Sequence, residues 1–464
     1  MADSESPLTS VTNLFRPATR PIDRLIRPIQ TFAKHKLAGA GLLMLATVVA
    51  LVWANSPWHH AYHHLLETDI AVSLGDASLS KTLHHWINDG LMGIFFFQVG
   101  LEIKRELLTG ELSSVRKASL PAIAALGGMV VPAGIYLALN LGGPAQGGWG
   151  VPMATDIAFA LGVLALLGDR ISIGLKVFLT ALAIVDDIGA VLVIALFYTS
   201  DLTVISLLIG LTCLLLSVGL NLAGSRNPIA YFVVGTCAWL AFLDSGIHAT
   251  IAALLMAFTI PARTRIDGES FLARMEFLLN RLRTIGLPQT TSMNSNAQQH
   301  TFEKMNQAID EASAPLQRIE HAIVGPVTFL VLPIFALANA GVTLHGDMGA
   351  VLTSPLVLGI VGGLLIGKTV GIAVSAWIAV KIGVADLPRK VTWMQVVGVG
   401  LLGGIGFTMA LFVAGLAFDS PEQGEAAKVG ILAGSTLAAV IGLLVLRTAT
   451  KPGEEPKPAE ADAH

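Results

Sequence analysis

Long apolar segments recur along this 464-residue chain, separated by short polar connections. Each is close to the ~20 residues that a helix needs to cross the hydrocarbon core of a bilayer. The pattern predicts an all-α polytopic membrane protein with about 12 transmembrane helices. The expected spans are 36–55, 85–108, 119–140, 151–168, 174–199, 203–222, 228–243, 247–261, 321–343, 353–381, 393–417 and 427–447.

Polar sequence outside these spans predicts three further segments. Residues 1–35 form an N-terminal tail, residues 449–464 form a C-terminal tail, and a loop at 262–320 is inserted between helices 8 and 9 of the 36–448 transmembrane domain. The first apolar run is too long for the hydrophobic region of a signal peptide, so we expect no cleaved leader. Within the loop, apolar residues recur at helical spacing and predict a short amphipathic helix, either on the inner leaflet or packed on the protein. They are Phe271, Met275, Leu278 and Leu282.

The distribution of positive charge predicts the orientation. Almost all of the 29 Lys and Arg residues fall in connections on the same side as the two termini. Lys81 and Lys428 fall on the other side, and Lys368 falls within a span. Because positively charged loops stay in the cytoplasm, both termini should be cytoplasmic.

Composition supports the membrane assignment and excludes other classes. The chain is 53% hydrophobic and 13% charged, with a mean hydropathy of +0.70 and a net charge of −3. Its basic residues are spread over many loops, which argues against nucleic-acid binding. Cys213 and Cys237 lie in apolar spans, where small packed side chains are expected rather than a disulfide.

One connection outside the spans has the pattern of a β-hairpin. Apolar and small or polar residues alternate from Ile70 to Leu79 around Gly75 and Asp76. We expect a short extracytoplasmic hairpin. An isolated two-stranded hairpin is marginally stable in water, so pairing with a second copy through about 70–80 would make a homodimer.

Two adjacent carboxylates, Asp186 and Asp187, occur in the middle of the apolar run from Leu175 to Tyr198. A rise of ~1.5 Å per residue places Asp186 roughly 15–18 Å from either end of its helix, too deep to reach the headgroups. Burying each charge costs roughly 2.5–3.5 kcal/mol, which indicates an ion or proton pathway. A polar pair that only holds helices together is the alternative.

Two spans carry residues that interrupt a helix. The fourth contains Pro152 and the pair Thr155-Asp156, and the eleventh is rich in glycine from Gly398 to Gly406. Interrupted spans in corresponding halves are typical of inverted repeats, here helices 3–5 and 10–12, with helices 4 and 11 crossing at mid-membrane. The Gly400/Gly404 pair also fits simple close packing. Asp156 and Lys368 have the charges needed to offset positive and negative helix ends.

These groups suggest how two ions could share one site. Burial disfavours a charged carboxylate and a nearby ammonium favours it, so such a site can titrate near neutral pH. If one carboxylate binds either H⁺ or a small cation, alternating access moves the two in opposite directions. Oxygen ligands for a hard cation could come from Asp187, Asp156, Thr155 and freed backbone carbonyls.

Several motifs together resemble the bacterial NhaA family of Na⁺/H⁺ antiporters, from about residue 36 to 448. They are residues 86–90 (WINDG), 100–106 (GLEIKRE), 154–162 (ATDIAFALG), 181–189 with the paired aspartates, Gly367-Lys368 and 404–409 (GIGFTM). The resemblance implies a transporter rather than an enzyme, with no cofactor, in the bacterial inner membrane. It implies electrogenic exchange of cytoplasmic Na⁺ or Li⁺ for external H⁺, driven by the proton gradient, in sodium and pH homeostasis.

The resemblance also implies roles for individual residues. Asp187 would be the main Na⁺ or Li⁺ ligand together with Asp186, Lys368 would pair with Asp186, and Asp156 beside Thr155 would lie where the interrupted helices cross. Activation at alkaline pH is implied as well. The matching pH-response candidates are Glu102, Arg105, Glu106, Glu320 and His321, with His248 as a further one.

The chain departs from the family pattern at three places. Val324-Gly325 stand where the family often has a second His, the loop before Glu320 is longer than usual, and Thr369 stands where some members have Pro. Two other functions fit the sequence less well. A sodium-coupled organic-anion symporter should not require both Asp186 and Asp187, and an intramembrane aspartyl protease needs carboxylates on different helices and a GxGD motif, which the sequence lacks.

Overall fold

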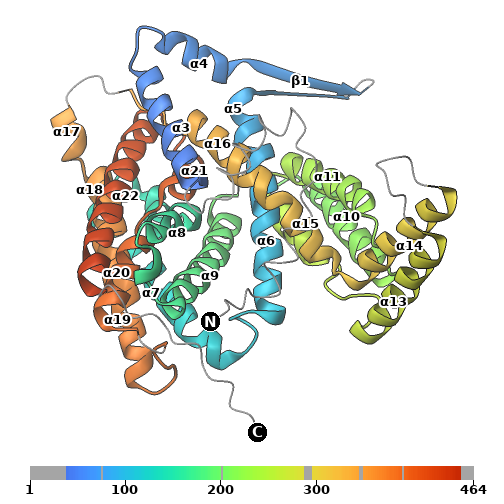
Figure 1. Cartoon of the computed structure of the whole chain (residues 1–464). Helices are drawn as coiled ribbons and strands as arrows, with labels where there is room; N and C mark the ends of the chain where they lie inside the picture. The colour runs from blue at the N-terminus through green and yellow to red at the C-terminus, as the bar shows by residue number, and fades with distance from the viewer. Residues whose placement is uncertain are drawn as a thin grey trace.

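The computed structural model of the chain describes residues 38–74, 77–199, 202–286, 295–343, 348–388 and 391–450. Across these ranges the chain is almost entirely helical, with one two-stranded antiparallel sheet (Figure 1). The all-α prediction and the hairpin prediction are therefore confirmed.

Eight helical segments in the described ranges are long and apolar enough to cross a membrane. The total rises to ten if two bent pairs each count as one span, namely α3 (Ala38–Ala54) with α4 (His59–Glu67) and α20 (Trp393–Gly403) with α21 (Phe407–Ala417). The protein is thus a multi-pass membrane protein. The two remaining predicted spans correspond to α6 (Met92–Thr109), whose end is charged, and α12 (Ala249–Thr259), which has only 11 residues.

The other spans that meet this test include five unbroken helices and three composite ones. The unbroken helices are α7 (Val115–Asn140), α9 (Ile173–Phe197), α10 (Val204–Leu222), α11 (Pro228–Ser245) and α22 (Pro421–Ala449). Helix α7 packs against α9, α18 and α19, and α22 packs against α18 and α20. These contacts place α9 inside the bundle, where its mid-helix residues are closed off from solvent.

Two composite spans contain a π-helical turn, which the sequence did not predict. One is α15 (Pro315–Pro326), η4 (Val327–Val331) and α16 (Leu332–Asn339); the other is α18 (Pro355–Gly362), η5 (Gly363–Gly367) and α19 (Lys368–Lys381). A third π turn, η1 (Trp86–Leu91), joins α5 (Leu83–His85) to α6. Prolines and glycines at these junctions weaken the regular i→i−4 ladder. As a result, Lys368 begins a helix immediately after a π turn.

The two predicted interruptions are present. The fourth segment is a 3₁₀ helix, η2 (Gln146–Met153), followed by three non-helical residues and then α8 (Ile157–Ala165). Helices α20 and α21 meet at a 46° bend at Gly404–Gly406. Proline in the first case and glycine density in the second explain why a continuous helix is not formed.

The hairpin consists of β1 (Asp69–Leu74) and β2 (Ala77–Thr82), with Leu74 paired with Ala77. Its predicted turn at Gly75 and Asp76 lies outside the described residues. Figure 1 shows the hairpin beyond one end of the helical bundle, beside α4 and α5. Small elements elsewhere are η3 (Gly168–Arg170) and α17 (Met348–Leu352).

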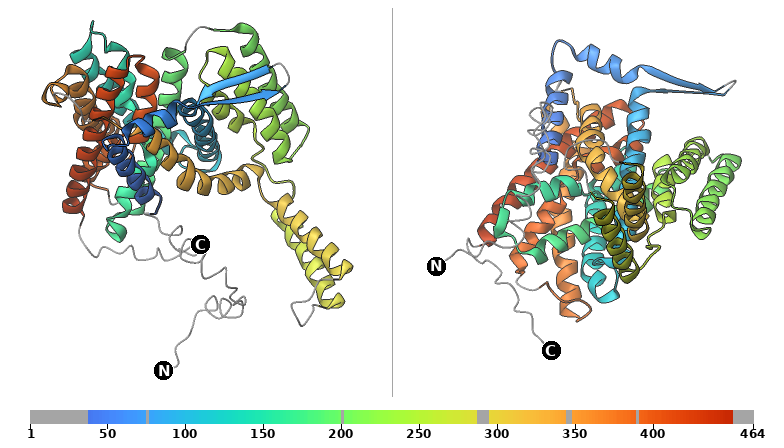
Figure 2. Two further views of the ribbon diagram at one scale, coloured as in Figure 1. Left: turned by 90° about the horizontal axis from the view of Figure 1, so that it is seen from above. Right: turned by 45° about the vertical axis from the view of Figure 1, so that its right-hand side comes forward.

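The inserted loop contains two helices, α13 (Gly268–Ile285) and α14 (Asn296–Ala312), which extend away from the bundle as a pair (Figure 2). Leu278 and Leu282 from the predicted amphipathic stripe are buried, and α13 packs against α14. The Arg274 guanidinium lies 2.7 Å from the Glu311 carboxylate across this pair. The stripe therefore packs on the protein.

Candidate functional site

The paired aspartates lie near the middle of α9. This helix begins at Ser172, whose hydroxyl accepts a hydrogen bond from the Leu175 N–H and caps the first turn. The helix then continues for 25 residues that contain no proline and are mostly apolar. Asp186 and Asp187 are 1% and 3% exposed, so both carboxylates are removed from bulk water as predicted.

Asp186 forms a buried ion pair with Lys368 from the start of α19. The Lys368 Nζ donates to Asp186 Oδ2 at 2.6 Å, and the lysine side chain is completely buried. The other oxygen, Asp186 Oδ1, has no hydrogen-bond partner, and Thr155 adjoins this carboxylate. The predicted pairing of Lys368 with Asp186 is thus present, and half of the Asp186 carboxylate remains unused.

Asp187 differs sharply from its neighbour. Successive helical residues are about 100° apart, so the two side chains point in different directions. In the part of the chain that the structure describes, the Asp187 carboxylate makes no hydrogen bond and no ion pair. A buried carboxylate without a protein partner is costly and calls for a ligand, a proton or water.

Asp156 lies where the two interrupted segments meet. Its Oδ1 accepts the Phe159 N–H at 2.9 Å and caps α8, while its Oδ2 accepts the Thr408 N–H at 3.1 Å and the Thr408 hydroxyl. The Asp156 N–H in turn donates to the Ile405 carbonyl at 2.7 Å. One carboxylate therefore serves the positive N-terminal ends of both α8 and α21, as the charge argument predicted.

Thr155 bonds to the opposite side of the same crossing. Its hydroxyl donates to the carbonyl of Gly403, at the end of α20, at 2.7 Å. The sequence predicted that Lys368 would offset a negative helix end. The Lys368 ammonium instead pairs with Asp186. The hydroxyl of Thr155 satisfies the Gly403 carbonyl instead. Sequence analysis did not identify Thr408 as a site residue, although it lies two residues after the glycine cluster.

The glycines of α20 permit close backbone approach. A Cβ at Gly404 would overlap the carbonyl oxygen of Leu364 in η5, and a Cβ at Gly400 would lie 3.1 Å from the Thr369 backbone. Both interpretations of this glycine cluster, close packing and a helix break, are therefore correct. Gly400 and Gly404 pack closely against η5 and α19, and the helix breaks directly after them.

Four of the pH-response candidates form one cluster at the charged end of α6. The Arg105 guanidinium lies 2.6 Å from Glu320, 3.0 Å from Glu106 and 3.9 Å from Glu102. Glu320 is contributed by α15 and has a buried side chain, so the cluster joins α6 to α15. The neighbouring Lys104, which sequence reasoning missed, donates to the Phe258 and Ile260 carbonyls and caps the end of α12.

The two histidine candidates lie outside this cluster. His321 is exposed and, within the described chain, makes no ion pair with it. His248 lies at the start of α12, with Nε2 3.6 Å from Asp89 and Nδ1 2.9 Å from the Thr250 hydroxyl. Only the candidates around Arg105 are therefore brought together.

The described residues contain no group of three His, Cys, Asp or Glu side chains arranged to hold a metal ion. A transported cation at Asp187 would thus complete its coordination with hydroxyl, carbonyl or water oxygens. Asp156 and Thr155 already use their side-chain oxygens at the helix crossing. Their position favours a role in fixing the ends of the interrupted segments near the paired aspartates.

Comparisons with known proteins show the family of this chain. The model of the Na⁺/H⁺ antiporter 1 family matches residues 30–446. A relative from Oleidesulfovibrio alaskensis, named Na(+)/H(+) antiporter NhaA, is 49% identical over 442 residues, which cover 95% of this chain and 98% of the relative. A relative of the same name from Koribacter versatilis is 48% identical over 446 residues, 96% and 97% of the two chains. The chain therefore belongs to the Na⁺/H⁺ antiporter 1 family.

Proposed function

We propose that this protein is a secondary transporter that exchanges cytoplasmic Na⁺ or Li⁺ for external H⁺ across the bacterial inner membrane. The observation that carries the proposal is the Asp187 carboxylate, buried in mid-helix without a hydrogen bond or ion pair, beside an Asp186 that Lys368 already neutralises. Family membership supports the same activity, and the names of the relatives describe Na⁺/H⁺ antiporters.

Asp187 is the primary ion and proton ligand in this proposal. A buried, unpartnered carboxylate is stabilised either by a proton or by a cation, and not by both at once. Asp186 supplies its free Oδ1 as a second ligand. The site binds Na⁺ when it faces the cytoplasm and H⁺ when it faces the outside. Each change of orientation therefore carries one ion, and the two ions move in opposite directions without a further coupling device.

Lys368 pairs with the Asp186 carboxylate and holds α19 against α9. Asp156 and Thr155 fix the ends of the two interrupted segments close to this pair. An inverted-repeat architecture, in which helices 3–5 and 10–12 correspond, accounts for two interrupted segments meeting at one place. In this topology all 12 predicted spans cross the membrane and both termini are cytoplasmic.

Electrogenic exchange driven by the proton gradient and activation at alkaline pH complete the proposal. The cluster of Glu102, Arg105, Glu106 and Glu320 is the proposed pH-responsive region, because its charges link α6 to α15.

A homodimer joined through the β-hairpins at about 70–80 is proposed as the functional assembly. A hairpin that extends beyond the helices leaves its strand edges available for such pairing.

Proton movement in inside-out vesicles tests the activity. A pH-sensitive dye should report Na⁺- and Li⁺-dependent proton movement from vesicles that contain the wild-type protein. Vesicles containing Asp187→Asn should give no response, because an amide cannot exchange a proton in this range and has no negative charge to balance a bound cation. An undiminished response from Asp187→Asn would remove this residue from the mechanism.

A further inference from the structure

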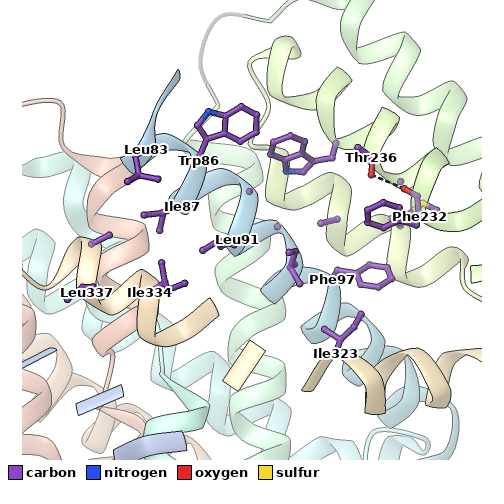
Figure 3. Close-up of a pocket in the computed structure, with 18 of the residues that line it drawn as sticks. Leu83, Trp86, Ile87, Leu91, Phe97, Phe232, Thr236, Ile323, Ile334 and Leu337 are labelled. Atoms are coloured by element: carbon purple, nitrogen blue, oxygen red, sulfur yellow. Dashed lines mark hydrogen bonds between the residues drawn. The ribbon is translucent and has the colours of Figure 1, made fainter. Parts of the chain in front are cut away.

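Helix α4 lies at the end of the bundle that carries the β-hairpin. It is bent by 112° from α3, and Figure 1 shows it extending from α3 towards β1. The Tyr62 hydroxyl fixes its inner face, because it donates to the Leu337 carbonyl of α16 at 2.8 Å. Through Leu65 and Leu66 this face also borders an apolar groove that runs along η1 and α6 and contains Ile87 (Figure 3). The opposite face of α4 is therefore left to water.

Four of the 12 histidines in the chain fall within α4. They are His59, His60, His63 and His64. A rotation of about 100° per residue places His60 and His64 each roughly 160° from Tyr62 and only about 40° from each other. The two side chains therefore share the outer face of α4, one turn apart. Both are exposed, and both border one surface notch together with Thr68.

The other two histidines are used by the protein itself. His59 Nδ1 donates to the Ser56 carbonyl at 3.2 Å, and the His63 ring meets the Tyr62 ring edge-on with centroids 5.3 Å apart. Both histidines are half-buried. The His60 ring lies against the anchored His59 ring, with centroids 4.0 Å apart, which restricts the rotamers of His60. The pair that faces water is therefore His60 and His64.

Two histidines at positions i and i+4 of one helix face have the spacing of a transition-metal site, as in the HExxH motif of zinc enzymes. Imidazole nitrogen suits Zn²⁺, Ni²⁺ and Cu²⁺, whereas hard cations prefer oxygen ligands. Ala61 stands where that motif has its glutamate, so this pair can hold a metal but supplies no base for hydrolysis. No third His, Cys, Asp or Glu in the described chain completes the ligand set, so water would fill the other positions.

We propose that His60 and His64 bind one transition-metal dication, such as Zn²⁺, on the outer face of α4. The bound ion joins two successive turns of the helix, on the side of the membrane that the distribution of positive charge predicts to be extracytoplasmic. The site is separate from the paired aspartates and takes a different class of ion. It needs no transport activity and is tested without it.

Isothermal titration calorimetry with Ni²⁺ tests the site, using full-length protein in detergent that has been purified through a tag without histidine. Wild type should show one saturable site per chain. Loss of a group that only orients a ligand lowers metal affinity about 10–100-fold. His60→Gln and His64→Gln each remove one of two ligands and should lower the affinity by at least as much. Both side chains are exposed, so the variants should keep the Tm of wild type.

His63→Gln and His300→Gln are the matched controls, and both should bind Ni²⁺ as wild type does. His63 lies in the same helix but is half-buried, and His300 is an exposed histidine of α14 without a second histidine one turn away. Na⁺ added at constant ionic strength should not displace Ni²⁺, because imidazole is a poor ligand for a hard cation.

Four results would overturn the proposal. Wild type without a saturable site would show that the outer face of α4 is only a solvated polar surface. Binding by His60→Gln/His64→Gln equal to that of wild type would mean an adventitious ion elsewhere on the protein. Loss of binding in His63→Gln would assign the ion to the half-buried pair, and displacement of Ni²⁺ by Na⁺ would move it to the transport site.

Discussion

The Lys368 ammonium and the Asp186 carboxylate meet at 2.6 Å with both side chains shielded from solvent, although 181 residues separate them in the sequence. A pair at this depth compensates two charges that neither could carry alone. The pair also leaves Asp187, one residue further along α9, as the carboxylate free to change partner.

Removing the lysine should destabilise the protein. Lys368→Ala leaves Asp186 buried and unpaired, a change that typically costs about 3–5 kcal/mol. Thermal unfolding in detergent should show a clear decrease in Tm. Lys176→Ala, at a partly exposed lysine in the first turn of α9, is the control. An unchanged Tm for Lys368→Ala would mean that Asp186 is neutral in the folded protein.

Asp187→Asn should abolish exchange without unfolding the protein, because the substitution removes only a charge that has no protein partner. Vesicle assays should give no Na⁺-dependent proton movement, while the Tm stays at or above that of wild type. Asp310→Asn, in the surface helix α14, should retain full activity. Loss of activity accompanied by loss of folded protein would assign Asp187 a structural role.

Gly404→Ala should damage the helix crossing. The added Cβ overlaps the Leu364 carbonyl oxygen, and backbone cannot move aside as a flexible side chain can. Overpacking of this kind costs about 1–3 kcal/mol. Gly415→Ala in α21 is matched, because nothing lies within 4 Å of its Cβ, and it should be neutral or slightly stabilising. Equal Tm values for the two variants would contradict the close approach.

Arg105→Gln should shift the pH dependence of exchange. Without the guanidinium, the ion pairs to Glu106 and Glu320 that join α6 to α15 are lost, so the midpoint of activation should shift. The measurement is the midpoint of Na⁺-dependent proton movement against pH. His321→Gln should leave the midpoint unchanged, because His321 is exposed and outside the cluster. A shift with His321→Gln alone would move the pH response to that side chain.

The α13–α14 pair should not respond to pH in the working range. Desolvation opposes ionisation of Glu311, but hydrogen bonds from Arg274 and Gln307 and the charges of Arg274 and Arg265 hold the pKa of Glu311 below its usual value. A lowered folded-state pKa stabilises the pair at pH values above the ordinary Glu pKa of ~4.3, and this stabilisation is lost only as pH falls through the lower folded value.

Hydrogen exchange, corrected for the intrinsic rate, tests this expectation. Protection of α13 and α14 should be the same at neutral and alkaline pH, and it should decrease in Glu311→Gln. Glu303→Gln, at an exposed site on α14, should have no effect. Protection that changes between neutral and alkaline pH would show that this pair takes part in the pH response.

The sequence by itself determined the membrane class, the positions of most helices, the hairpin and the two interruptions. These features depend on local properties: apolar run length, alternation, proline and glycine. It also identified the depth of Asp186 and Asp187, because helical rise converts residue number directly into distance. The family resemblance gave the partner of Asp186.

Only the tertiary structure decided how polar groups are shared among segments far apart in the chain. The use of Asp156 by both α8 and α21, the bond from Thr155 to Gly403 and the capping of α12 by Lys104 each depend on which helix ends meet. The π turns and the groove beside α6 likewise arise from packing. The amino-acid sequence shows which polar groups need a partner, whereas the packing of the helices decides which partner each group contacts.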